Sequence, residues 1–253
     1  MGPRDGVVKI EFCGICGSDL HAWSAGGAIF PYGTLMGHEG VGTAEKVGPE
    51  ATMIKPGDRV AINGFTPCRQ CFACQAGMVN ACANNMARTI GNSLSLDGAF
   101  ADRVYLPDID VSAVKIPDHL PSEHAAFIEP AATGVHAIRL SNYKVGDSVA
   151  VVGAGPIGLL VTAGLKAAGA GQIIVSQRPG QRADLAMEFG ATHTINPRDE
   201  NVSVGEQIRE ITDSGADVVI ECAGAPAALQ QSIDMARPRG QVILVGVNEA
   251  RTL

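Results

Sequence analysis

Four cysteines lie close together in the sequence, at a spacing that suits metal binding. Two Cys-x-x-Cys steps and one further cysteine fall within fifteen residues, at Cys68, Cys71, Cys74 and Cys82. Thiolates are soft ligands, and four of them form a closed tetrahedral shell around Zn²⁺. The spacing therefore predicts a structural zinc site that does no chemistry of its own. An iron–sulfur cluster and disulfides are the alternatives, although disulfides need an oxidising compartment, of which the sequence shows no sign.

A glycine-rich turn lies between an apolar run at residues 149–152 and a helix-like segment at residues 156–168. Its glycines have the G-x-G-x-x-G spacing, which permits a tight turn and lets a pyrophosphate approach the N-terminus of a helix. The turn therefore predicts a dinucleotide site formed by Gly153, Gly155, Pro156, Ile157 and Gly158. A glycine-rich turn with a purely structural role is the alternative.

The residues after the second apolar run, 173–176, bear on the choice of cofactor. An acidic residue at this point accepts hydrogen bonds from the adenosine ribose of NAD and repels the extra phosphate of NADP. This chain has the neutral Gln177, followed by Arg178 and Arg182. Because arginine pairs well with phosphate oxygens, the sequence predicts NADP in preference to NAD. The alternative is that both arginines only solvate a surface turn.

Further candidate ligands lie in three other segments. Cys16 falls within residues 13–21, His38 and Glu39 form a Gly-His-Glu-Gly motif, and Glu129 precedes Pro130. With the cysteine cluster and the glycine turn, these make five motifs in one order along essentially the whole chain. Because these motifs occur in this order, the chain resembles the zinc-dependent medium-chain dehydrogenases. Glu129 stands at the position where the ethanol dehydrogenases of this family have a cysteine. A Glu-Pro pair at this position resembles the sorbitol, threonine and butanediol dehydrogenase branch.

The resemblance implies a second, catalytic zinc and gives particular residues a role. The implied ligands are Cys16, His38, Glu39 and Glu129, and whether Glu39 or Glu129 binds the metal directly is left open. Such a site leaves room for a substrate oxygen, and Zn²⁺ lowers the pKa of a bound alcohol. Cys13 and Cys222 match no ligand position and are interpreted as structural.

The resemblance also implies residues that assist the reaction. Ser18 and His21 would carry the alcohol proton to solvent, and Asp19 would orient His38 and fix its tautomer. Thr133 would lie beside the nicotinamide ring. A turn or cap role for Ser18 and Asp19, and an ordinary helix-interior position for Thr133, are the alternatives.

The expected elements fit this assignment. Strands are expected over residues 7–12, 41–47 and 59–62, and a helix near residues 121–123 with Ser122 as a candidate cap. Beyond residue 148, strands at 149–152, 173–176, 218–221 and 242–245 alternate with helices at 156–168, 181–189, 204–212 and 227–235. This alternation predicts a parallel sheet covered on both faces. The resemblance implies an α/β fold with a β-rich GroES-like catalytic domain over residues 1–143 and a doubly wound Rossmann domain over residues 144–253, its last part missing.

The family's sequences extend beyond Leu253 and begin with a further strand before residue 7. We therefore expect a truncated chain whose last strand is an unpaired edge that favours irregular self-association. A zinc- and nucleotide-binding protein without turnover is the alternative to an enzyme. A zinc-free quinone reductase is disfavoured by Cys16, His38 and the cysteine cluster.

Composition restricts the remaining function classes. The net charge of -7 argues against a nucleic-acid partner, and no signal peptide follows Met1. An uncharged stretch at residues 148–165 is better explained as strand, turn and helix than as a membrane span. We expect a cytoplasmic oxidoreductase that transfers hydride between a secondary alcohol or polyol, or the matching ketone, and a nicotinamide cofactor. A homo-oligomer is expected for a full-length form.

Overall fold

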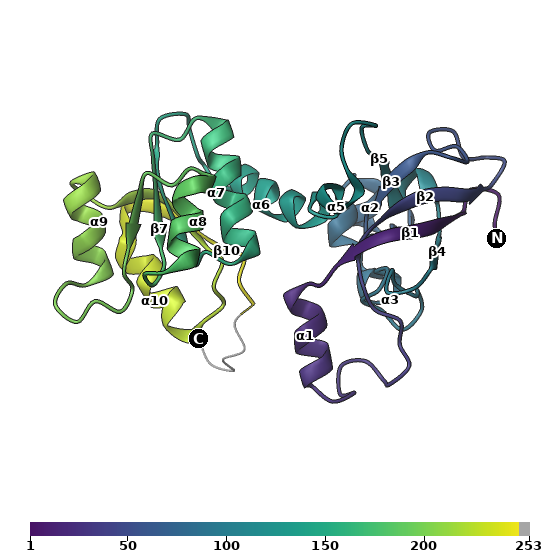
Figure 1. Cartoon of the computed structure of the whole chain (residues 1–253), viewed down its shortest axis with the longest axis horizontal. Helices are drawn as coiled ribbons and strands as arrows, with labels where there is room; N and C mark the ends of the chain where they lie inside the picture. Colours follow the sequence, from purple (N-terminus) through teal and green to yellow (C-terminus); the bar gives the residue numbers. More distant parts are fainter. Residues whose placement is uncertain (248–253) are drawn as a thin grey trace. The chain divides into compact units, whose positions relative to one another are not determined.

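The computed structural model describes residues 1–247. The chain divides into two compact units, Met1–Glu129 and Pro130–Leu253 (Figure 1). The division falls within the helix α6 (Ile128–Leu140), close to its first residue. The domain boundary expected at residue 143 stays a prediction.

The N-terminal unit is built on an antiparallel sheet of order β4-β1-β2-β3-β5. Its strands are β1 (Gly6–Gly14), β2 (Glu39–Val47), β3 (Arg59–Ile62), β4 (Arg103–Leu106) and β5 (Ala113–Lys115). Short helices connect them: α1 (Gly17–Ser24), α2 (Phe72–Gln75), η1 (Val79–Ala81), α3 (Asn85–Arg88), α4 (Ile109–Ser112) and α5 (Ser122–Ala125). Branched apolar residues such as Val8, Val60 and Leu106 are fully buried and form the core. The three strands expected here are confirmed.

The second unit is built on a parallel sheet of order β10-β9-β6-β7-β8. Its strands are β6 (Ser148–Val152), β7 (Gln172–Ser176), β8 (His193–Ile195), β9 (Ala216–Glu221) and β10 (Ala236–Leu244). The helices after α6 are α7 (Pro156–Ala168), α8 (Gln181–Phe189), α9 (Val204–Thr212) and α10 (Pro226–Met235). The predicted parallel sheet is confirmed, with the four expected helices within one residue of their predicted ends.

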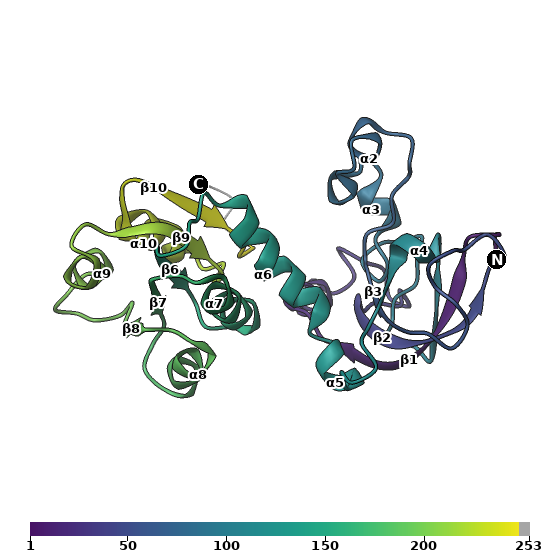
Figure 2. The ribbon, with the colours of Figure 1, turned by 90° about the horizontal axis from the view of Figure 1, so that it is seen from above.

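Both faces of the parallel sheet are covered, as predicted. Helices α6, α7 and α8 pack on one face, where Val149 and Val151 meet Val161 of α7. Helices α9 and α10 cover the opposite face, where Ala150 and Val152 contribute to the core (Figure 2). Because successive residues of a strand point to opposite faces, the continuous apolar run of β6 supplies both cores.

Two details differ from expectation. Helix α5 begins at the expected place, but its N-cap is Pro121, and the Ser122 hydroxyl instead donates a hydrogen bond to the Glu11 carboxylate. A carboxylate is a stronger acceptor than a neutral group, and the Arg59 guanidinium holds the same hydroxyl at 2.9 Å. Strand β10 begins at Ala236, before the expected residue 242.

In the described part of the chain, no helix is long and apolar enough to cross a membrane. The uncharged stretch at residues 148–165 forms β6, a turn and the first part of α7, as expected.

Candidate metal centres and cofactor site

The four clustered cysteines converge in space. The sulfur atoms of Cys68, Cys71, Cys74 and Cys82 all lie within 4.8 Å of one another. The Sγ atoms of Cys68 and Cys74 are 3.9 Å apart. A tetrahedral zinc with Zn–S bonds of about 2.3 Å separates its sulfurs by about 3.8 Å, so these residues fit the ion. All four are free thiols, and no pair is bonded as a disulfide.

Short helical turns aim backbone N–H groups at these sulfurs. Cys71 is the N-cap of α2, and Cys82 follows η1 and accepts a hydrogen bond from the N–H of Asn84 at 3.4 Å. Backbone N–H groups of Gln70 and Cys71 lower the pKa of the Cys68 thiol to about 5. Amide donors of this kind stabilise thiolates, which are the form that binds a metal.

A second group of candidate ligands gathers at one end of the N-terminal sheet. The ligand atoms of Cys16, His38 and Glu39 lie within 4.8 Å of one another. His38 and Glu39 are buried, with 7% and 9% of their surface exposed. Three ligands of mixed type leave a position open on a zinc ion, which is the arrangement of a catalytic site.

The register of two strands brings these ligands together. Gly14, the last residue of β1, pairs with Glu39, the first residue of β2. Cys16 therefore follows the end of one strand where His38 precedes the start of the next. Cys16 is also the N-cap of α1, and its backbone N–H donates to Asp19 Oδ2 at 2.8 Å. Helix α1, which the sequence did not predict, thus fixes the Cys16 thiol beside His38.

Electrostatics favour the ligand form of the Cys16 thiol. A hydrogen bond with His38 lowers the pKa of Cys16, and burial only partly opposes this effect. Burial alone would lower the pKa of His38, but the hydrogen bond with Cys16, together with the charges of Cys16, Asp19 and Glu129, outweighs it and raises the pKa. Burial raises the pKa of Glu39. The site thus favours the charged forms of the Cys16 thiol and the His38 ring, and disfavours the charged form of the Glu39 carboxyl group.

The imidazole of His38 has two neighbours at Nδ1. The amide Nδ2 of Asn92 lies 3.0 Å away, and Asp19 Oδ1 lies 3.8 Å away. Asn92 comes close because Gly91, with φ of 69°, packs against the backbone of Gly37. Asp19 is 5% exposed, and its Oδ1 has no hydrogen-bond partner in the part of the chain described. Asn92 carried no signal in the sequence, since a single asparagine in a loop matches no motif.

The other expected residues are placed as follows. Glu129 is outside the group of converging ligand atoms found in the described residues. Burial raises the pKa of its carboxyl group, and the charge of His38 only partly opposes this effect. Ser18, in the first turn of α1, donates hydrogen bonds to the Cys16 sulfur from its backbone and its hydroxyl. His21 lies three residues later on α1 and is exposed. Thr133 lies inside α6, half-buried.

The glycine turn has the geometry that a pyrophosphate needs. Gly153 has φ of 93°, Gly155 is the N-cap of α7, and Pro156 is the first residue of the helix. A Cβ atom on Gly158 would collide with the carbonyl of Gly153, so only glycine allows this close approach. The turn lies on a cavity of about 350 Å³ at the carboxyl ends of β6, β7 and β9. Ligands of parallel α/β sheets bind at this edge.

Three arginines line this cavity. Arg178 and Arg182 follow β7, as the sequence indicated, and Arg198 comes from the loop after β8. Sequence reasoning missed Arg198 because it missed β8, whose residues His193 and Thr194 are exposed and polar. No aspartate or glutamate is among the residues described as lining the cavity. Its charged lining is therefore entirely positive.

Gln177 and Glu221 shape the loops of the cavity. Gln177 Oε1 accepts a hydrogen bond from the N–H of Ala154 at 3.0 Å, which ties β7 to the glycine turn. Glu221, the last residue of β9, is 3% exposed. Its Oε1 accepts from the N–H groups of Ala223 and Gly224 at 2.6 and 2.8 Å.

Known families match both units. Residues 2–118 match the alcohol dehydrogenase GroES-like domain, and residues 156–252 match the zinc-binding dehydrogenase family. The sorbitol dehydrogenase of Bacillus subtilis (strain 168) is 38% identical over 245 residues, which cover 95% of this chain and 67% of that protein.

Solved structures agree with this assignment. The alcohol dehydrogenase TADH from Thermus sp. ATN1 has a TM-score of 0.90 and 34% identity, with 100% of this chain and 72% of that chain covered. A zinc-binding dehydrogenase from Sinorhizobium meliloti 1021 bound to NADP has a TM-score of 0.88 and 37% identity, with the same coverage.

A GroES-like unit with two converging groups of candidate zinc ligands, followed by a Rossmann unit with a glycine turn, defines a zinc-dependent oxidoreductase. The chain belongs to the zinc-binding dehydrogenase family, within the alcohol dehydrogenase superfamily. The family and the fold class inferred from the motifs are thereby confirmed.

Proposed function

We propose that this chain transfers hydride reversibly between a secondary alcohol, in a small polyol or hydroxylated metabolite, and a nicotinamide cofactor. The observation that carries the proposal is the convergence of the ligand atoms of Cys16, His38 and Glu39 within 4.8 Å, at the end of β1 and the start of β2. These ligand types fit zinc and leave a position free for a substrate oxygen. A zinc ion held there supplies a Lewis acid that lowers the pKa of the alcohol.

The protein's own groups support the proton transfer that must accompany hydride transfer. Ser18 lies against the Cys16 sulfur and is exposed, so its hydroxyl could take a proton from an alcohol bound there while giving up its own. His21, also exposed and on the same helix, is suited to pass that proton to solvent. Asp19, held by the N–H of Cys16, keeps the start of α1 in place. Glu129 supplies a further carboxyl group in electrostatic reach of His38.

We also propose that the preferred cofactor is NADP. Pyrophosphate binding at the N-terminus of α7 is supported by the backbone of Gly153 and Gly155. The ribose phosphate of NADP suits a cavity lined by Arg178, Arg182 and Arg198 and by no described carboxylate. Gln177 is neutral, and its Oε1 is already occupied by Ala154. It therefore neither repels a phosphate nor replaces the acid that would bind the ribose of NAD.

The cysteine cluster is proposed to hold a second, structural zinc. Its four sulfurs form a closed shell, and α2 and η1 are too short to be stable without such a cross-link. Such an ion contributes folding free energy to the lobe and takes no part in the reaction.

The test is a screen of polyols, diols and amino alcohols in which reduced nicotinamide is followed by its absorbance. We expect turnover of a secondary alcohol that is lost in Cys16→Ala and retained in Cys13→Ala. Cys13 is the matched control because it is a neighbouring cysteine outside the converging ligands. Zinc content at the cluster and dinucleotide binding without any turnover across the screen would contradict the proposed enzyme and favour a binding protein.

A further inference from the structure

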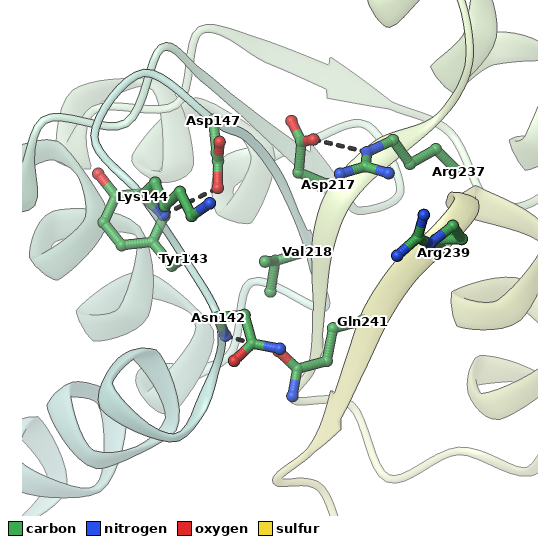
Figure 3. Close-up of a pocket in the computed structure, with 9 residues that line it drawn as sticks. All are labelled: Asn142, Tyr143, Lys144, Asp147, Asp217, Val218, Arg237, Arg239 and Gln241. Atoms are coloured by element: carbon green, nitrogen blue, oxygen red, sulfur yellow. Dashed lines mark hydrogen bonds and ion pairs between the residues drawn. The ribbon is translucent and has the colours of Figure 1, made fainter.

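A larger cavity lies near the amino ends of β6 and β9, whereas the glycine turn lies at the carboxyl end of β6. Figure 3 shows the residues that line it. Its volume is about 700 Å³. The cavity is bordered by the segment just before β6 and by the start of β9, whereas the glycine turn follows the carboxyl end of β6. It is therefore separate from the proposed cofactor site. The polar residues that line it and matter here are Lys144, Asp147, Asp217, Arg237, Arg239 and Gln241.

Three carboxylate oxygens in this lining accept hydrogen bonds from the protein itself. Asp147 Oδ2 accepts from the backbone N–H of Lys144 at 2.8 Å. Asp217 Oδ1 accepts from Arg237 Nε at 2.6 Å, and its Oδ2 accepts from the hydroxyl of Ser148 at 2.7 Å. Asp217 is thus paired with Arg237, and Asp147 is tied by Oδ2 to the backbone of Lys144, so both carboxylates help to hold the walls together.

The side-chain amide of Gln241 is engaged only through its oxygen. Its Oε1 accepts from the backbone N–H of Asn142 at 2.6 Å, which joins β10 to the loop after α6. Its Nε2 donates to no group in the described chain. This residue of the lining therefore keeps one donor without a partner among the described residues.

Two positively charged side chains in the lining, Lys144 and Arg239, are further hydrogen-bond donors. Figure 3 shows Lys144 and Arg239 on opposite walls, one from the loop before β6 and the other from β10. Neither the Lys144 ammonium nor the Arg239 guanidinium has a hydrogen bond or an ion pair within residues 1–247. In a chain with a net charge of -7, this places two unpaired positive charges around one cavity.

The backbone at Arg239 is also unusual. Its φ is 65°, a left-handed conformation that residues with a Cβ atom seldom adopt. Strained positions of this kind persist only where the surrounding structure imposes them, and they are frequent at ligand sites. Here the strained residue is also one of the two unpaired cations.

We propose that this cavity binds a small phosphate-bearing anion between Lys144 and Arg239, with the amide of Gln241 as a third donor. The guanidinium plane matches two phosphate oxygens, and the ammonium is a point charge suited to a third. The volume suits a small organic molecule. The ligand is recognised by its phosphate group, which a free phosphate ion and a phosphate ester share.

The experiment is calorimetric titration of the chain with inorganic phosphate and, separately, with glycerol 3-phosphate, at constant ionic strength. The test variants are Lys144→Gln and Arg239→Gly. Glycine tolerates the backbone angle at residue 239, so this variant keeps the fold, which its thermal unfolding midpoint checks. Arg198→Gln is the matched control, since it removes one positive charge from the other cavity.

We expect each test variant to bind the probe about tenfold more weakly or worse, because a charge-assisted hydrogen bond is lost. The Arg198→Gln variant should retain at least one binding event of unchanged affinity. Tighter binding of the ester than of inorganic phosphate would identify an organic ligand, and equal binding would identify the free ion. The proposal is overturned if neither probe binds, if both test variants bind as the parent does, or if Arg198→Gln alone abolishes binding.

Discussion

The preference for NADP can be tested on cofactor fragments, without any turnover. Adenosine 2′,5′-bisphosphate and adenosine 5′-monophosphate differ only in the 2′-phosphate that the three arginines are proposed to bind. The perturbation is the removal of one arginine at a time, as Arg178→Gln and Arg198→Gln. Arg209→Gln is the matched control, because Arg209 is an exposed arginine of α9 outside the cavity lining.

The size of the effect follows from the environment of the arginines. A charge-assisted hydrogen bond contributes about 1.5–3 kcal/mol, or roughly tenfold to a hundredfold in affinity. Arg178 and Arg198 are exposed, so solvent and salt screen their contacts and the lower end applies. No described carboxylate in the lining competes for them. We therefore expect about a tenfold loss for the bisphosphate in each variant.

The assay is equilibrium binding of both fragments at fixed salt. The parent chain should bind the bisphosphate more tightly, and the monophosphate should be nearly unaffected by either substitution. Gln177→Asp combined with Arg178→Leu should invert the preference between NADP and NAD, since a carboxylate then faces the phosphate. The reasoning fails if the parent binds both fragments equally, or if Arg209→Gln changes bisphosphate binding as much as Arg198→Gln does.

Three further outcomes are expected. Cys71→Ala and Cys16→Ala should each remove one zinc by metal analysis, but only Cys71→Ala should lower the thermal unfolding midpoint strongly; equal falls would contradict the assignment of separate structural and catalytic sites. Asn92→Leu should weaken zinc binding at His38 by about ten- to a hundredfold in a chelator competition, because the partner of the imidazole is lost, and unchanged affinity would refute that role. Burial alone would raise the pKa of Asp110, but hydrogen bonds from the backbone N–H groups of residues 52–54 outweigh it and lower the pKa to about 2. Its stabilisation should be complete above about pH 4 and lost as the pH falls toward 2, and denaturant unfolding of Asp110→Asn should lack this loss.

Periodic patterns predicted the second unit well. Buried parallel strands read as continuous apolar runs, and Gly169 and Gly190 end α7 and α8 in the left-handed conformation that glycine favours. Strand β8 escaped prediction because two of its three residues are exposed and polar. Arg198, which follows it, was therefore not recognised as part of the cavity.

The N-terminal unit was harder to predict in detail. Helix α1 has no apolar periodicity, and its start is fixed by the bond between Asp19 and the N–H of Cys16. The motifs still indicated Cys16, His38 and Glu39, because their spacing resembles a known family. The contact of Asn92 with His38 depends on the close packing of two glycine backbones far apart in sequence, which no local pattern reveals.

The carboxylate of Glu221 occupies a group of backbone amides close to the proposed dinucleotide site. The N–H groups of Ala223 and Gly224 point at one spot, and such paired amides attract anions wherever they are open. They lie beside the glycine turn, since a Cβ atom on Gly153 would come within 3.0 Å of Ala223. Because Glu221 already fills this nest, these two amides are not open to a pyrophosphate, and we expect the N-terminus of α7 to receive it instead.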